Sequence, residues 1–148
     1  MKSPHLRFAL PSDIGLLYTW ANDPVVRGNS FNGSPISYGE HQKWFNRIMA
    51  DPSVVQFILE DEEKPIGQIR LTIQRDVAEI GYSIAPEFRG RGYGHKILQL
   101  VLEETRKNYP QIKKLTAKVK PCNTVSGKLF ESEGYTLAYL CYGLEIEH

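Results

Sequence analysis

The chain has 148 residues, with 18 Lys and Arg against 17 Asp and Glu, which gives a formal net charge of +1. This length fits one domain over residues 1–148, and the near-zero charge gives no support to a nucleic-acid or anionic-membrane partner. Cys122 and Cys141 lack metal-ligand spacing, no apolar run reaches the ~20 residues of a membrane helix, and no signal peptide begins the chain. We therefore expect a cytoplasmic protein without a metal site.

The first third of the chain predicts one short strand and two helices around a polar loop. The strand is Leu6–Leu10, and Ser12 is expected to cap a helix that runs to about residue 20. Asn22–Pro35 is rich in Asn, Gly, Ser and Pro, so we expect a long loop there. The spacing Ser37-x-x-Glu40 is a capping box, which predicts that a second helix begins at this point.

The rest of the chain predicts an antiparallel meander followed by a parallel crossover. The expected elements are strands over 54–59, 66–74 and 77–84, a helix over 92–108, a strand over 113–120, a helix over 123–134, and one or two strands over 135–146. The order is therefore β-α-α-β-β-β-α-β-α-β-β. It predicts an α/β fold with a mixed central sheet of six or seven strands and helices on both faces.

The hairpin over residues 66–84 can be given a register from the sequence. With Arg75-Asp76 as a two-residue turn, Thr72 lies opposite Glu79, Arg70 opposite Gly81, and Gln68 opposite Ser83. These side chains then share one face and form a polar wall, in which Gly81 leaves room beside Arg70. Glu79 is either a general base in this wall or a solvated carboxylate paired with Arg70.

A glycine-rich turn is the strongest motif in the chain. Arg89-Gly90-Arg91-Gly92-Tyr93-Gly94 follows a predicted strand and begins an amphipathic helix. Glycines at such a junction let backbone N–H groups converge on an anion, and the helix N-terminus adds partial positive charge. The spacing matches neither a dinucleotide-binding fingerprint nor a P-loop. The turn is therefore predicted to bind a pyrophosphate.

Three segments resemble the GNAT acetyltransferase superfamily. Arg89-x-x-Gly92-x-Gly94 matches its Gln/Arg-x-x-Gly-x-Gly/Ala signature, residues 78–88 resemble its fourth strand and exit, and Asn123-x-x-Ser126-x-x-x-Phe130 resembles its second cofactor segment. The resemblance covers nearly the whole chain. It implies the GNAT fold and an enzyme that moves an acetyl group from acetyl-CoA to a primary amine by direct transfer.

The resemblance also implies roles for individual residues. The CoA pyrophosphate is expected on the turn Arg89, Gly90, Arg91, Gly92, Tyr93 and Gly94. The pantetheine is expected where the fourth strand splays from the fifth, with Ser83 and Ile84 on one side and Asn123, Ser126 and Phe130 on the other. Glu79 matches the strand position that supplies the base in several GNAT enzymes. Phe130 stands where many of them have a tyrosine, so the usual proton donor is missing.

The acceptor is expected to contact the N-terminal half of the chain. Trp20-Ala21-Asn22-Asp23-Pro24 and Glu40-His41-x-x-Trp44-Phe45 resemble a GNAT branch that acts on nucleotide-linked amino sugars, as in the pseudaminic-acid pathway and surface-polysaccharide biosynthesis. The candidate acceptor contacts are Arg27, Asn29, His41, Arg70 and Thr72, with Arg27 near the phosphates. A protein N-terminus is the alternative acceptor, because related openings occur in GNAT enzymes with that substrate. A non-catalytic acyl-CoA-binding module is the alternative outside enzymes.

Overall fold

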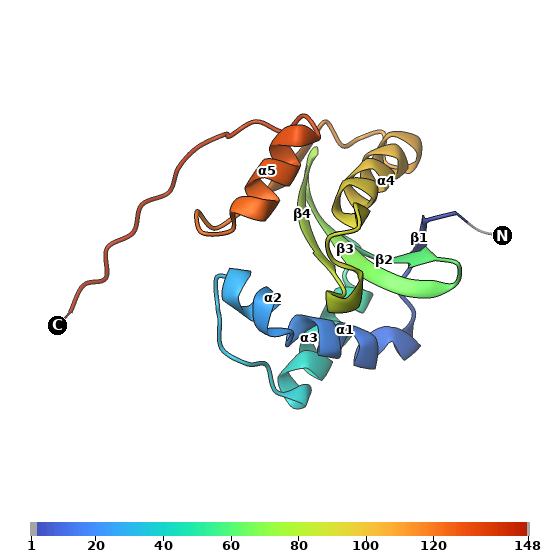
Figure 1. The fold of residues 1–148 in the computed structure, drawn as a ribbon, viewed down its shortest axis with the longest axis horizontal. Helices are drawn as coiled ribbons and strands as arrows, with labels where there is room; N and C mark the ends of the chain where they lie inside the picture. Colours follow the sequence, from blue (N-terminus) through green and yellow to red (C-terminus); the bar gives the residue numbers. More distant parts are fainter. Residues whose placement is uncertain (1–2, 148) are drawn as a thin grey trace.

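One five-stranded sheet runs through the centre of the computed structural model, which describes residues 3–147 (Figure 1). The strands, in spatial order, are His5–Phe8 (β1), Val54–Asp61 (β2), Lys64–Gln74 (β3), Val77–Ile84 (β4) and Lys114–Ala117 (β5). β1 to β4 are antiparallel to their neighbours, whereas β5 runs parallel to β4. The predicted mixed sheet is confirmed, but it has five strands rather than six or seven.

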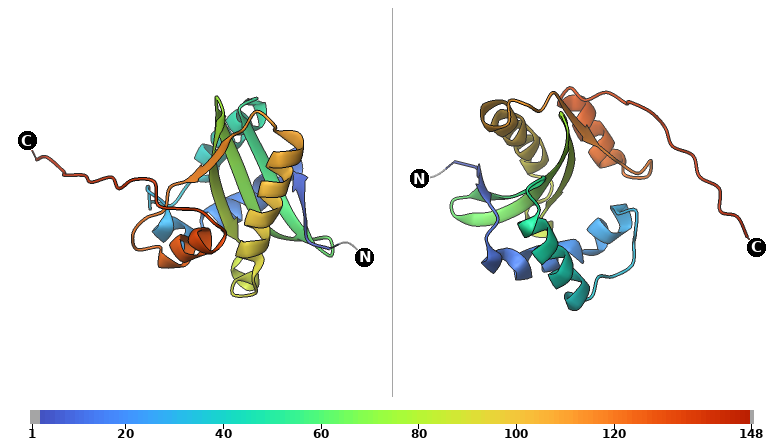
Figure 2. Two further views of the ribbon diagram at one scale, coloured as in Figure 1. Left: turned by 90° about the horizontal axis from the view of Figure 1, so that it is seen from above. Right: turned by 180° about the vertical axis from the view of Figure 1, so that it is seen from behind.

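Helices cover both faces of this sheet, as predicted (Figure 2). They are Ile14–Ala21 (α1), Pro24–Asn29 (α2), Tyr38–Ala50 (α3), Tyr93–Asn108 (α4) and Thr124–Ser132 (α5). α4 packs against one face through Ile97, Leu98 and Val101, all of which are buried in the larger core cluster. α1 and α3 cover the other face, where Phe45 packs with Ile58. Within residues 3–147, none of the helices combines the length and apolar character needed to cross a bilayer.

The first helix begins later than predicted. Ser12 does not cap it; Pro11–Asp13 forms a 3-10 turn that leads into α1. The carboxylate of Asp13 accepts the N–H of Leu10 at 2.7 Å and two N–H groups of Arg7 at 2.8 and 3.0 Å. Asp13 does not cap α1 with its side chain; its carboxylate instead joins the start of the helix to Leu10 and to Arg7 of β1.

The segment 22–35 is not a continuous loop, because α2 lies inside it. The side chain of Asp23 accepts the N–H of Val26 at 3.3 Å, and Pro24 occupies the first helical turn. An Asp cap followed by Pro is a helix-start signal, which the high content of Asn, Gly and Ser in this segment obscured. The predicted helix start at Ser37 is confirmed, since its hydroxyl accepts the N–H of Glu40 at 3.2 Å.

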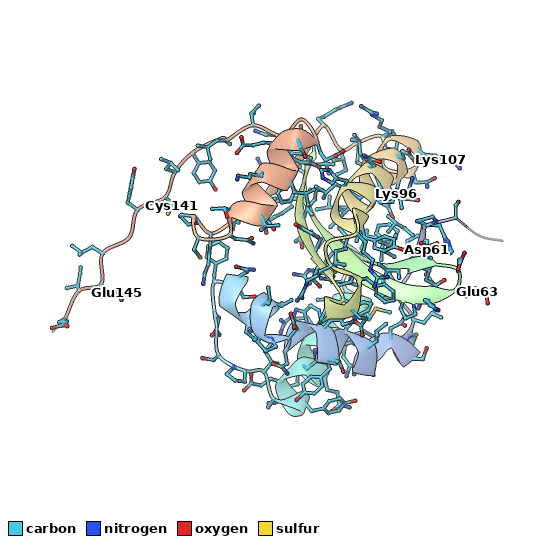
Figure 3. The ribbon with its side chains drawn as sticks, viewed as in Figure 1. Asp61, Glu63, Lys96, Lys107, Cys141 and Glu145 are labelled. Carbon is cyan, nitrogen blue, oxygen red and sulfur yellow. The ribbon has the colours of Figure 1, made fainter. Side chains whose placement is uncertain are left out.

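The strands predicted over 135–146 are not formed. No helix or strand is assigned from residue 133 to residue 147, and Figure 3 shows Cys141 and Glu145 on an extended segment that leads away from the folded body. Tyr139, Tyr142 and Leu144 on this segment are exposed. An alternating pattern forms a strand only where a neighbouring strand supplies hydrogen bonds, and β5 offers an edge of only four residues.

The hairpin of β3 and β4 has the predicted register. Thr72 pairs with Glu79, Arg70 with Gly81, and Gln68 with Ser83. The two-residue turn between Gln74 and Val77 is also confirmed, with Arg75 at a φ of 60°. This register places the predicted polar wall on the face of the sheet that α1 and α3 partly cover.

Candidate active site

A cleft of about 940 Å³ opens where β4 and β5 part. β5 pairs with β4 only from Val77 to Ile80, so Gly81–Ile84 continue beyond the last pair and line the cleft. α2 lies on one side of this opening and α5 on the other (Figure 1). The edge of β4 therefore presents backbone hydrogen-bonding groups to the cleft, which agrees with the expected gap between the fourth and fifth strands.

The glycine-rich turn forms one end of the cleft. Gly90 and Gly92 have φ values of 75° and 83°, and Gly92 is the N-cap of α4. No side chain caps this helix start, so the N–H groups of its first turn point outward without intrahelical acceptors. A Cβ built on Gly92 would find no atom of the protein within 4 Å, so the space above the turn is open. Open amides at a helix N-terminus fit a pyrophosphate.

The larger side chains of the turn hold its shape instead of facing an anion. Arg89 donates from Nε to the carbonyl of Ile84 at 3.1 Å and forms an ion pair with Asp23, the cap of α2. Arg91 lies over the ring of Phe88, with 5.6 Å between its guanidinium carbon and the ring centre, and it does not line the cleft. Protein groups thus contact both guanidinium groups, although Arg89 also lines the cleft, and a contact of either residue with the phosphates stays a prediction.

Tyr93, also predicted to contact the cofactor, lines the cleft, but its hydroxyl donates away from the turn. The acceptor is the carboxylate of Asp61 at 2.6 Å, at the turn between β2 and β3 (Figure 3). Gly94 also lines the cleft, and a Cβ at this position would meet the side chain of Leu129 at 2.8 Å. Gly94 therefore lets α4 and α5 approach closely beside the turn.

α5 forms the wall opposite the β4 edge. Asn123 caps it by accepting the N–H of Ser126 at 3.2 Å, and the hydroxyl groups of Ser126 and Tyr82 lie 2.8 Å apart. Phe130 is 7% exposed and packs edge-on against Tyr82 and Tyr135. All three predicted residues, Asn123, Ser126 and Phe130, line the cleft, together with Ser83 and Ile84 of β4.

Tyr82 is a cleft residue that sequence reasoning missed. Strand alternation assigns it to the core on the face opposite the polar wall, and the structure does place it on that face, against Phe130. Its hydroxyl nevertheless reaches Ser126 in the cleft, where burial raises the pKa of the phenol. Tyr82 is thus a protonated hydroxyl beside the position where the family's tyrosine is replaced by Phe130. Only the contact with α5, which is distant in sequence, reveals it.

Glu79 and Lys118 form an exposed ion pair beside the cleft. Their Oε1 and Nζ atoms are 3.3 Å apart, and 43% of the Glu79 side chain is exposed. The ion-paired cation is therefore Lys118 of the segment after β5, and not Arg70, which was one of the two alternatives for Glu79. Lys118 lines the cleft, whereas Glu79 lies at its edge. A carboxylate in this place is accessible to water and to an incoming amine.

The predicted acceptor contacts lie in different environments. Asn29 lines the cleft, and Thr72 is exposed on β3. His41 is only 1% exposed and its Nε2 lies 2.9 Å from the carbonyl of Ile14, so it joins α3 to α1 and does not reach a ligand. Its assignment as a binding residue is wrong for this reason. Arg70, the remaining candidate, lies beside the cleft residue Gly81.

The guanidinium of Arg27 is hydrogen-bonded within its own loop. It donates to the backbone carbonyls of Ala21 at 2.7 Å, Asn32 at 3.0 Å and Ser34 at 3.2 Å, and to the hydroxyl of Ser30 at 3.2 Å. Arg27 does not line the cleft. These bonds give it a structural role in ordering residues 21–34, which corrects its expected position near phosphates.

A chain of side-chain amides, which the sequence did not indicate, leads to the β4 edge. Gln56 donates to Gln68 at 2.8 Å, and Gln68 donates to the hydroxyl of Ser83 at 3.1 Å. Gln56 is buried, and its amide nitrogen also donates to the backbone carbonyls of Phe57 and Ile69 within the sheet. The chain fixes the orientation of Ser83, one of the predicted cofactor contacts.

Comparison with known proteins identifies the family. The acetyltransferase (GNAT) domain family matches residues 5–136. The uncharacterized N-acetyltransferase YfmK of Bacillus subtilis (strain 168) is 25% identical over 95 residues, which span 64% of this chain and 63% of that protein.

Solved structures share the fold at lower identity. The spermidine N-acetyltransferase from Vibrio cholerae, in complex with CoA and spermine, superposes with a TM-score of 0.84 at 22% identity, covering 98% of this chain and 88% of that one. The aminoglycoside acetyltransferase AAC(6')-Ib with coenzyme A and kanamycin gives 0.79 at 21% identity, covering 90% and 84%. The family match spans the turn, the β4 edge and α5 described above, and this chain belongs to the acetyltransferase (GNAT) domain family.

Proposed function

We propose that this chain is an N-acetyltransferase that uses acetyl-CoA and transfers the acetyl group directly to a primary amine. The observation that carries the proposal is the uncapped glycine turn at the end of a cleft between β4 and α5. Backbone amides at Gly92 and Gly94 suit the pyrophosphate, and the unpaired edge of β4 suits the amide-rich pantetheine. Acetyl-CoA supplies an acyl group activated as a thioester.

The residues around the cleft have separate tasks in this proposal. Ser83 and Ile84 offer backbone groups to one side of the pantetheine, and Asn123, Ser126 and Phe130 form the other side. Glu79, beside Lys118, accepts the proton of the incoming amine, directly or through water, because only a neutral amine is nucleophilic. The hydroxyl of Tyr82, held against Ser126, is an O–H donor inside the cleft.

For the acceptor we propose a small-molecule amine, and specifically an amino-sugar nucleotide. The support comes from the likeness of the N-terminal half to enzymes of that branch and from Asn29 and Ser30 on the cleft wall. Arg27 does not support this proposal, since its N–H groups are engaged within its loop. A protein N-terminus is the second candidate, because the N-terminal half also resembles GNAT enzymes that act on that substrate.

Two measurements test the proposal. Calorimetry should detect CoA binding to the wild-type chain, and thiol release from acetyl-CoA should depend on an added amine. The panel contains a UDP-linked amino sugar, a short peptide with a free N-terminus, and spermidine. CoA binding without thiol release for any amine would favour the non-catalytic binding module. Absence of CoA binding would contradict the proposal altogether.

A further inference from the structure

Arg70 is a partly buried cation whose guanidinium has no hydrogen-bonded or ion-paired partner among the described residues. It lies on β3 with Gly81 of β4 opposite, and its guanidinium carbon stands 5.3 Å from the ring centre of Trp44. Burial lowers the pKa of Arg70, and the nearby negative charge of Glu79 opposes this shift. Among residues 3–147, no hydrogen bond or ion pair involves its guanidinium, although other arginines in this part of the chain have carboxylates or carbonyls to bind. A partly buried guanidinium without such a bond lacks the acceptors that usually offset its desolvation.

Gly81 leaves room for the guanidinium of Arg70 because it has no side chain. A Cβ on Gly81 would lie 3.3 Å from Nη2 of Arg70, so a larger residue there would push the side chain aside. Gly81 also lines the cleft. The missing side chain therefore leaves the guanidinium directly behind the cleft wall, where a ligand atom can approach its N–H groups. Trp44 covers one face of the guanidinium, which leaves the N–H edge as its binding surface.

Arg70 stands one step along the wall from Glu79. The pair Arg70–Gly81 and the pair Thr72–Glu79 are two residues apart on the same face of the hairpin. Two residues of strand span about 7 Å along the wall, and we take this spacing as the scale of the separation between a group bound by Arg70 and an amine at Glu79. A short molecule with an amine at one end and an acid group at the other bridges this distance.

The local charge disfavours a polycation. Arg70 and Lys118 each contribute one positive charge to this wall. Glu79, which forms an ion pair with Lys118, contributes one negative charge. A second ammonium group of a polyamine would face Arg70 and be repelled, whereas a carboxylate or phosphate would be attracted and bound in fork geometry. This differs from the ligands of the structural relatives, spermine and kanamycin, with which the chain shares only the fold.

We propose that Arg70 binds an anionic group of the acceptor, so that the substrate is a primary amine bearing a carboxylate or phosphate about 7 Å away. The inference rests on the proposed acetyltransferase function, because it assigns the acceptor of that same cleft. Arg70 is then a specificity-determining residue for the acid group. It replaces Arg27 as the residue that recognises phosphate.

The test compares matched amines that differ only in the acid group. Glucosamine 6-phosphate is paired with glucosamine, and the dipeptide Ala-Gly with its C-terminal amide, while spermidine represents polycations. For at least one of the two pairs, we expect the wild-type chain to have a kcat/KM at least about 30-fold higher for the acid-bearing amine than for its neutral partner. The pair that shows this preference identifies whether Arg70 recognises a phosphate or a carboxylate. Arg70→Met should abolish this preference mainly by raising the acceptor KM, and Arg70→Lys should keep part of it.

Binding without turnover separates this inference from the proposed function. Titration of the CoA-saturated protein with the same amines by calorimetry should show the same preference even if no acetyl group is transferred. Arg47→Met, which removes an exposed positive charge from α3, is the control for net charge and should leave the preference within about twofold. Gly81→Ala should weaken the preference by displacing the guanidinium while keeping its charge.

Three results would overturn the inference. One is equal binding of the acid-bearing and neutral members of both pairs by the wild-type chain. Another is preference for spermidine over every acid-bearing amine. The third is an unchanged preference in folded Arg70→Met, with folding verified by thermal denaturation and by unaltered CoA affinity.

Discussion

Replacing Gly92 with valine should weaken CoA binding while leaving the fold intact. Gly92 has a φ of 83°, where an L-residue costs about 1–2 kcal/mol, so the free energy of unfolding should fall by roughly that amount. The new side chain meets no protein atom within 4 Å of its Cβ, and it instead occupies the open space over the turn amides. We expect the Kd for CoA to rise at least about 10-fold, equivalent to about 1.4 kcal/mol.

Gly134→Val is the matched control for this substitution. Gly134 has a φ of 94°, and a Cβ added to it would meet no protein atom within 4 Å, as at Gly92, but it does not line the cleft beside β4. Both variants should lose similar stability in chemical denaturation, whereas only Gly92→Val should lose CoA affinity in calorimetry. A folded Gly92→Val protein with a Kd within twofold of the wild type would refute the argument that the turn amides hold the pyrophosphate.

The other predictions concern catalysis and stability. Glu79→Gln should lower kcat by roughly 100-fold and retain CoA affinity, whereas Glu103→Gln on α4 should change neither; near wild-type turnover of Glu79→Gln would leave Glu79 as a surface charge. Phe130→Tyr should change kcat by less than about threefold, and a rise of tenfold or more would show that a proton donor limits the reaction. The guanidinium of Arg7 holds the pKa of Asp13 below its usual value, so this pair stabilises the fold above about pH 4 and loses that effect as the pH falls through the lower native pKa. Asp13→Asn should therefore cost about 1–2 kcal/mol in urea denaturation at pH 7, and a cost that did not shrink toward pH 3 would contradict this assignment.

The parts of the structure that follow from local pattern could be predicted from the sequence. The hairpin register follows from a two-residue turn and a period of two, and it places Arg70 opposite Gly81 correctly. The glycine turn is recognisable because positive φ and an uncapped helix start have a clear sequence signature. The gap between β4 and β5 is predicted from the resemblance to GNAT enzymes. The pairing of β4 with β5, which ends at Ile80, agrees with this prediction.

Sequence patterns fail where partners distant in the chain decide what a side chain does. His41 is a polar residue at a plausible position for a ligand contact, but its ring lies against the backbone carbonyl of Ile14 on another helix. Glu79 pairs with Lys118, which no strand pattern places beside it. Residues 135–146 are rich in apolar and aromatic residues that favour strands, yet among the residues that the structure describes no adjoining strand pairs with them.

The ion pair between Arg89 and Asp23 ties two ligand-binding regions to one another. Asp23 caps α2, which lines the acceptor side of the cleft, and Arg89 belongs to the turn on the cofactor side. Any ligand that draws Arg89 away from Asp23 withdraws the charge partner of the α2 cap and changes how firmly α2 is held. Binding free energies are reciprocal, so an acceptor that orders α2 must then alter CoA affinity by the same factor by which CoA alters affinity for the acceptor. A coupling of this kind would pass through one contact between side chains that are 66 residues apart in the sequence.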